Sequence, residues 1–172
     1  MASPKRSFLF SVLPSAVILG LLLVVSCKNG DPTTTTTNNS IQGSWRITAV
    51  NISPAVVQSG VSFSEITSPL NLLENNCIGS TTLTFSNGTV TNNSTSISAC
   101  TNSTNSKQLV NTFFASSTSY TETDNQLTVR GPQTITATKT VNNATATLVT
   151  SLSVNPLNQP TPTSYTMVLT KQ

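Results

Sequence analysis

Histidine is absent from the chain, and only five side chains carry a carboxylate. The five are Asp31, Asp124, Glu65, Glu74 and Glu122. Most general acid–base catalysis uses a histidine or two carboxylates held close together, and these five form no clear pair along the chain. The sequence therefore predicts a protein that is not an enzyme and needs no cofactor. The alternative is an enzyme that uses Glu65 or Glu74.

Charged residues are also scarce, at 8% of the chain, where about 25% is usual. Two of the basic residues, Lys5 and Arg6, lie near the start, and the chain after residue 26 carries six basic and five acidic side chains. Its net charge of +1 leaves no basic stripe that could follow a phosphate backbone, so nucleic-acid binding is disfavoured. Thr, Ser and Asn supply the polarity instead, and β-branched Thr suits a pleated strand.

The one long apolar run is confined to the start of the chain. Lys5 and Arg6 precede the apolar residues 8–25, and the letters VVSC at residues 24–27 end this run on a cysteine. This order resembles the signal peptide of bacterial lipoproteins. The resemblance implies that residues 1–26 are removed and that the thiol of Cys27 carries a diacylglyceryl group. We therefore expect export and lipid anchoring to the cell envelope at the outer membrane, with the membrane as a partner.

Two further features concern this anchor. Residues 8–26 are just long enough to cross a bilayer as an uncleaved helix, but Pro14 interrupts them and no charged stop-transfer cluster follows. Two or more acyl chains hold a protein stably on a membrane without such a helix. Residues 27–40 are rich in Thr and lack apolar periodicity, so we expect a flexible tether ahead of a domain at residues 41–172.

Cysteine occurs three times in the sequence. If Cys27 is acylated, Cys77 and Cys100 remain as a pair in an exported, oxidising compartment, which predicts a disulfide between them. Two buried thiols or a metal pair are the alternatives. A zinc site needs four ligands and no histidine is present to supply one, so we expect no metal.

From residue 41 onward apolar and polar residues alternate, as in a strand with one buried face. Turns are indicated by Asn87 with Gly88, by Asp124 with Asn125, and by Asn142 with Asn143. The pattern predicts eight strands, near residues 43–51, 80–86, 89–97, 109–121, 126–131, 133–141, 144–154 and 163–171. In the strand at 109–121, Phe113 and Phe114 would face opposite sides.

The alternation fails between residues 51 and 79. Ser68 followed by Pro69 is typical of a helix N-cap and first turn, which predicts a long loop with a short helix that covers one end of the sheet. A series of antiparallel strands joined by tight turns closes a barrel or a sandwich. We expect an all-β fold, an eight-stranded antiparallel up-and-down barrel with this short helix in its first long loop.

Several motifs in order resemble the lipocalin-like domains of bacterial lipoproteins. The order is Gly43 and Trp45, a helix at residues 72–77 that runs into Cys77, Leu83 with Phe85 and Gly88, Cys100, Tyr120 with Leu127 and Thr128, and Tyr165. The resemblance covers residues 41–172 and implies a barrel that binds a small apolar or amphipathic molecule. Lipocalins often stack an Arg against the tryptophan, but the last strand here carries only Lys171. We expect Trp45 to plug the closed end of the barrel.

Alternate residues of each strand face the same side of the sheet, so the pattern indicates which residues line the interior. The ligand-lining candidates are Ile47, Leu83, Phe85, Leu127, Ile135, Ala137, Lys139, Leu148, Tyr165 and Met167. Lys139 shares parity with Ile135 and Ala137 and would meet a ligand carboxylate at the barrel mouth, unless it reaches out to solvent or a bulge turns it outward.

Other classes of function remain open from the sequence. One is a structural or interaction lipoprotein with a filled core, since protein interiors are normally close-packed. Another is an immunoglobulin-like adhesive sandwich, although Trp45 precedes both cysteines rather than lying between them.

Overall fold

A computed structural model describes residues 39–152 and 163–172 of the chain, apart from the side chain of Gln58. The expected signal peptide, Cys27 and most of the expected tether lie outside the described residues. All elements considered below belong to the unit that contains the barrel.

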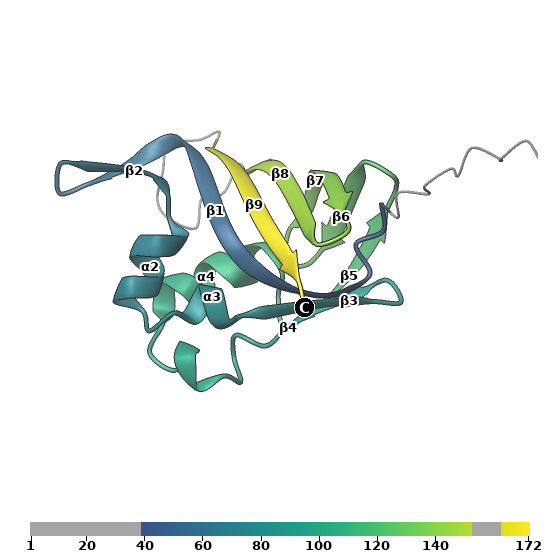
Figure 1. Ribbon diagram of the computed structural model, residues 1–172, viewed down its shortest axis with the longest axis horizontal. Coiled ribbons are helices and arrows are strands. Elements are labelled where there is room, and N and C mark those ends of the chain that lie inside the picture. The colour runs from purple at the N-terminus through teal and green to yellow at the C-terminus, as the bar shows by residue number, and fades with distance from the viewer. Residues whose placement is uncertain (1–38, 153–162) are drawn as a thin grey trace, which may run out of the picture. The chain divides into compact units, whose positions relative to one another are not determined.

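The sheet closes into a barrel (Figure 1). It has nine strands, and consecutive strands pair antiparallel from β3 to β9. β1 pairs with both β3 and β9, which closes a ring of eight strands and leaves β2 outside it. The strands are β1 Gly43–Gln58, β2 Val61–Glu65, β3 Thr82–Ser86, β4 Thr89–Asn92, β5 Ser117–Glu122, β6 Gln126–Arg130, β7 Thr134–Asn142, β8 Thr145–Leu152 and β9 Thr163–Lys171. The predicted eight-stranded up-and-down barrel is confirmed, and the two-layer sandwich is excluded because the ring is closed.

Strand alternation fixes which side chains enter the barrel. Along β7 exposed threonines alternate with buried Ile135, Ala137, Lys139 and Val141. The same alternation buries Leu127 and Val129 in β6. The alternation of apolar and polar residues along these strands therefore gives the barrel an apolar interior and an outer face rich in hydroxyl groups.

The predicted turn at Asn87 and Gly88 joins β3 to β4. Both residues have positive φ, 50° and 74°, which a two-residue hairpin of this kind requires and which Asn and Gly adopt at low cost. The turns β3–β4, β5–β6 and β7–β8 lie at the same end of the barrel as the start of β1. We call this the hairpin end and the opposite one the cap end.

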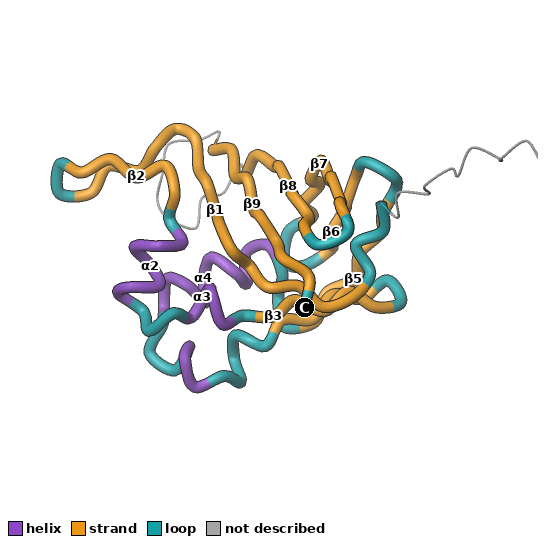
Figure 2. The backbone as a smooth tube through the Cα atoms, in the orientation of Figure 1, coloured by secondary structure: helices purple, strands orange, loops and turns teal. Residues whose placement is uncertain are grey.

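Four short helical elements gather at the cap end, coloured purple in Figure 2. They are α2 Thr67–Leu73, α3 Cys77–Ser80, the 3-10 helix η1 Ser98–Cys100 and α4 Thr104–Phe113. The disulfide Cys77–Cys100 joins α3 to η1, as predicted. Glu74 links α2 to α4, because its carboxylate accepts hydrogen bonds from the backbone N–H groups of Asn105 and Ser106 at 3.0 and 2.7 Å.

The predicted strand at residues 109–121 is wrong over its first half, where α4 ends at Phe113. Ser106, Leu109, Val110 and Phe113 are its buried residues, and this spacing of three and four is helical rather than alternating. The Glu74 carboxylate satisfies backbone N–H groups of its first turn, a tertiary contact that the local sequence does not display. Phe113 and Phe114 are both buried, not on opposite faces.

Two smaller corrections concern the first long loop and β4. β1 runs on to Gln58 and forms a hairpin with β2 before the predicted short helix begins. That helix starts at Thr67 and has no capping bond from Ser68; instead the Glu65 carboxylate accepts hydrogen bonds from the N–H groups of Thr67 and Ser68. β4 ends at Asn92 rather than residue 97, because Ser94 N–H binds the Asn92 side chain and turns the chain.

Candidate functional site

The hairpin end of the barrel is closed by Trp45, which is fully buried. Its indole N–H donates to the carbonyl oxygen of Ile41 at 2.7 Å, so the polar atom of this large side chain is satisfied by backbone. Lys171 Nζ lies 5.5 Å from the centre of the Trp45 ring, within the range of a cation–π contact. Trp45 therefore fills the hairpin end of the barrel as expected, with Lys171 over its ring.

Lys139 points inward and completes this closure. Its side chain is 1% exposed and Nζ lies 2.5 Å from Glu122 Oε2. Nζ also donates to the carbonyl oxygen of Asn39 at 2.6 Å. Glu122 accepts two further hydrogen bonds, from the Ser40 hydroxyl at 2.8 Å and from Ile41 N–H at 3.0 Å. The ion pair therefore fastens residues 39–41 across the hairpin end.

Electrostatics favour the ionised form of Glu122. Partial burial acts to raise the pKa of its carboxyl, but the hydrogen bonds from Lys139, Ile41 N–H and Ser40, together with the charge of Lys139, outweigh burial and lower this pKa. A buried ammonium without a partner is costly, and Glu122 supplies that partner. Lys139 therefore lies at the closed end of the barrel, where its ammonium is paired with Glu122.

An apolar cavity lies in the other half of the barrel, toward the cap end. The volume open to the centre of a water-sized molecule is about 20 Å³, room for about one such molecule. The lining residues are Phe113, Phe114, Leu127, Val129, Ile135, Ala137, Leu148, Thr150, Tyr165 and Met167. Burial raises the pKa of Tyr165 to about 12, so its phenol is neutral at physiological pH and the lining carries no charge.

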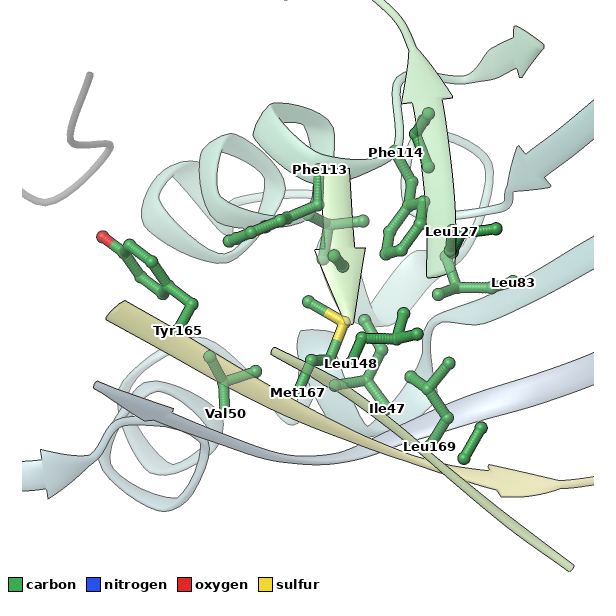
Figure 3. Packing of buried hydrophobic residues seen from close by; sticks show 14 of the residues in the cluster. Ile47, Val50, Leu83, Phe113, Phe114, Leu127, Leu148, Tyr165, Met167 and Leu169 are labelled. Atoms are coloured by element: carbon green, nitrogen blue, oxygen red, sulfur yellow. The ribbon is translucent and has the colours of Figure 1, made fainter. Parts of the chain in front are cut away.

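The end of α4 inserts two aromatic rings into this half of the barrel. Figure 3 shows the rings of Phe113 and Phe114 lying between Tyr165 and Leu127. Phe113 meets the Tyr165 ring edge to face, with 5.2 Å between ring centres. The carbonyl oxygen of Phe114 accepts a hydrogen bond from the Asn92 side chain. The rings of α4, rather than the barrel strands alone, set the size of the cavity.

The structure divides the ten predicted lining residues into three groups. Leu127, Ile135, Ala137, Leu148, Tyr165 and Met167 line the cavity. Ile47, Leu83 and Phe85 are buried in the core but do not reach it, and Lys139 lies at the hairpin end.

Four lining residues were missed by sequence reasoning. Val129 and Thr150 could have been found, because they share parity with Leu127 and Leu148 two positions earlier. Phe113 and Phe114 could not, because the sequence predicts a strand at residues 109–121, and no local signal places a helix end inside a barrel.

Glu65 and Glu74 both act on the backbone of the cap. Their oxygens accept hydrogen bonds from backbone N–H groups near the starts of α2 and α4. Within residues 39–152 and 163–172, no three His, Cys, Asp or Glu side chains are grouped so that they could hold a metal ion. In the same part of the chain, no helix combines the length and apolar character needed to cross a membrane.

No known protein family, curated protein or solved structure shows significant similarity to this chain.

Proposed function

We propose that this chain is an exported lipoprotein, held on the outer membrane through an acylated Cys27, whose lipocalin-like barrel binds one small apolar or amphipathic molecule and catalyses no reaction. One observation carries the proposal of binding. The barrel is sealed at the hairpin end by Trp45 and the Lys139–Glu122 pair, while the other half holds a cavity lined almost entirely by apolar side chains. An uncharged lining favours a hydrocarbon ligand, because a charged group there would lack a partner.

The free-energy cost of enlarging the cavity further restricts the chemical class of the ligand. A molecule larger than one water needs some lining side chains to move, and the proposal takes these to be Phe113 or Phe114, at the end of α4. Exposing one such ring costs roughly 1.5–3 kcal/mol, whereas each CH₂ group buried in its place contributes about 0.8 kcal/mol. About two to four buried CH₂ groups therefore offset one displaced ring. A flexible alkyl chain, with any polar head left outside, meets this requirement.

Native mass spectrometry of the full, membrane-extracted protein tests ligand binding. We expect a co-purified small molecule, and binding of a saturated C8–C12 fatty alcohol used as the probe. Ala137→Leu adds bulk to the cavity wall and should weaken probe binding at least tenfold. Thr138→Leu is the matched control, because it makes the adjacent residue Leu on the exposed face of the same strand and should bind like wild type.

Metabolic labelling with an alkyne fatty acid tests the anchor separately. The wild-type chain should carry the label and Cys27→Ser should lose it, while Lys28→Ala keeps it. An unlabelled wild-type chain would contradict the lipoprotein assignment without bearing on the cavity.

A non-enzymatic structural or interaction lipoprotein with a filled core is the second candidate. The cavity of about 20 Å³ favours it, because the space as it stands admits no alkyl chain. This candidate predicts no co-purified molecule and equal, negligible probe binding by wild type and Ala137→Leu.

A further inference from the structure

β2 has one edge that pairs with no other strand in the described part of the chain, residues 39–152 and 163–172. β1 pairs with β9 up to Ser53, and it pairs with β2 at Asn51 and, after a shift in register, from Val56 to Gln58. The two strands extend beyond the barrel as an arm, at the left of Figure 1. An unpaired edge presents free N–H and C=O groups and is a template for pairing with another chain.

The turn of this arm determines which backbone groups are free. Ser59 and Gly60 form a two-residue loop with φ of 51° and 81°, and Gln58 lies opposite Val61. In such a hairpin the flanking residues exchange both hydrogen bonds, and bonded and non-bonded pairs then alternate. Ser62 and Ser64 consequently direct their N–H and C=O groups away from β1, toward the open edge.

Proteins usually protect an edge strand with proline, lysine, an inward charge or a covering element, and the sequence of β2 supplies neither of the first two. Residues 52–64 contain no charged residue. Val57 and Val61 are 68% and 53% exposed. Glu65, the one acid of β2, is engaged with the N–H groups that begin α2.

We propose that β2 is a dimerisation strand that pairs antiparallel with β2 of a second copy of this chain. A two-fold axis at Phe63 places Ser62 opposite Ser64 of the partner subunit, and the reciprocal pair gives four backbone hydrogen bonds. Uncharged arms do not repel one another, which favours an identical copy as the occupant. A two-fold contact uses the only open edge of β2 on both copies, so it closes at a dimer and does not propagate into a fibre.

The proposal includes α2, which follows β2 in the chain, in this interface. α2 begins two residues after β2, and its Leu72 and Leu73 are 86% and 77% exposed. Large aliphatic side chains that are this exposed can form part of an interaction surface. The interface does not use the cavity or the anchor, so the inference does not depend on the proposed function.

Light scattering after size-exclusion chromatography, on the full chain in detergent, tests the dimer. Wild type should shift from monomer to dimer as its concentration rises. Ser62→Pro removes the N–H that faces the open edge, and Ser62→Lys adds a charge there, so both should remain monomeric. Thr136→Lys makes the same charge change on the exposed face of β7 and should dimerise like wild type. Circular dichroism verifies that each variant is folded.

Disulfide trapping tests the register. Phe63→Cys brings two thiols together at the proposed axis, where Cα atoms of a non-bonded antiparallel pair lie about 4.5 Å apart, within disulfide range. Oxidation should therefore yield a covalent dimer. A wild-type chain that stays monomeric at every concentration, or a Ser62→Lys chain that dimerises like wild type, overturns the proposal. A monomer that instead binds lipid vesicles through Val57 and Leu72 also overturns it.

Discussion

Lys139 and Glu122 show what single residues contribute to the closed end of the barrel. The alternation of β7 predicts that Lys139 points inward, and it does. Its partner was not predictable, because Glu122 lies two strands earlier, on β5, and residues 39–41 approach from far away in the sequence. The alternation along a strand determines whether a side chain points inward or outward. Its contacts depend on which distant segments meet when the barrel closes.

Replacement of Lys139 should destabilise the fold. Lys139→Met leaves the Glu122 carboxylate and the Asn39 carbonyl without their donor, and we expect the free energy of unfolding to fall by about 3 kcal/mol, the lower end of the range for a broken buried pair, since the Glu122 side chain keeps 20% exposure. Urea titration measures the loss. The control Thr138→Met, at the exposed neighbouring position, should change stability little. Equal stability of wild type and Lys139→Met would contradict the structural role of the pair.

Acid should weaken the same contact. The pKa of Glu122 is lowered in the folded chain below its ordinary value of 4.5. The stability it contributes is therefore complete above pH 4.5 and is lost as the pH falls through the lowered folded value. Urea midpoints between pH 2 and 7 should decline more steeply for wild type than for Glu122→Gln, which cannot titrate. Parallel profiles for the two proteins would argue against this assignment.

At the scale of elements, the barrel strands follow the sequence and the cap does not. The alternating segments at β6, β7 and β9 and the turn at Asn87 and Gly88 form as predicted. α4 and the β1–β2 arm were missed. The cap depends on the Glu74 carboxylate, which binds backbone N–H groups 31 and 32 residues away. Contacts between residues so far apart cannot be predicted from the local pattern of apolar and polar residues. Only the cavity residues that lie on strands could be predicted, because two of the other lining residues, Phe113 and Phe114, come from the end of α4.

The disulfide should stabilise the cap more than the barrel. Cys77 and Cys100 are 23 residues apart, and closing a loop of this size contributes about 3 kcal/mol in the chain-entropy model. Cys77→Ala/Cys100→Ala should lower the free energy of unfolding by this amount. Hydrogen exchange should also rise first in residues 98–114, while β7 and β8 keep their protection. A uniform rise over all strands would show that cap and barrel open together.

At the scale of the whole molecule, the ring closes only because β1 meets β9. Their pairing joins Trp45 to Lys171 and Ser53 to Ser164, at opposite ends of the described sequence. The number of strands and the turns between them predicted an up-and-down order, but the choice between a barrel and a sandwich depended on this one pairing. Closure gives the domain an inside, and the plug and the cap divide that inside into a filled half and a half with a small apolar cavity.

Methyl NMR of Met167 tests most directly whether that cavity takes an apolar ligand. Methionine occurs twice in the sequence, and a chain processed at Cys27 keeps only Met167, which lines the cavity. Labelling of methionine methyl groups therefore gives a single probe inside the barrel. We predict that a C8–C12 fatty alcohol shifts this resonance to a saturable endpoint in wild type and does so far more weakly in Ala137→Leu. A Met167 signal that stays unchanged at saturating alcohol, in a folded and acylated protein, would contradict the account.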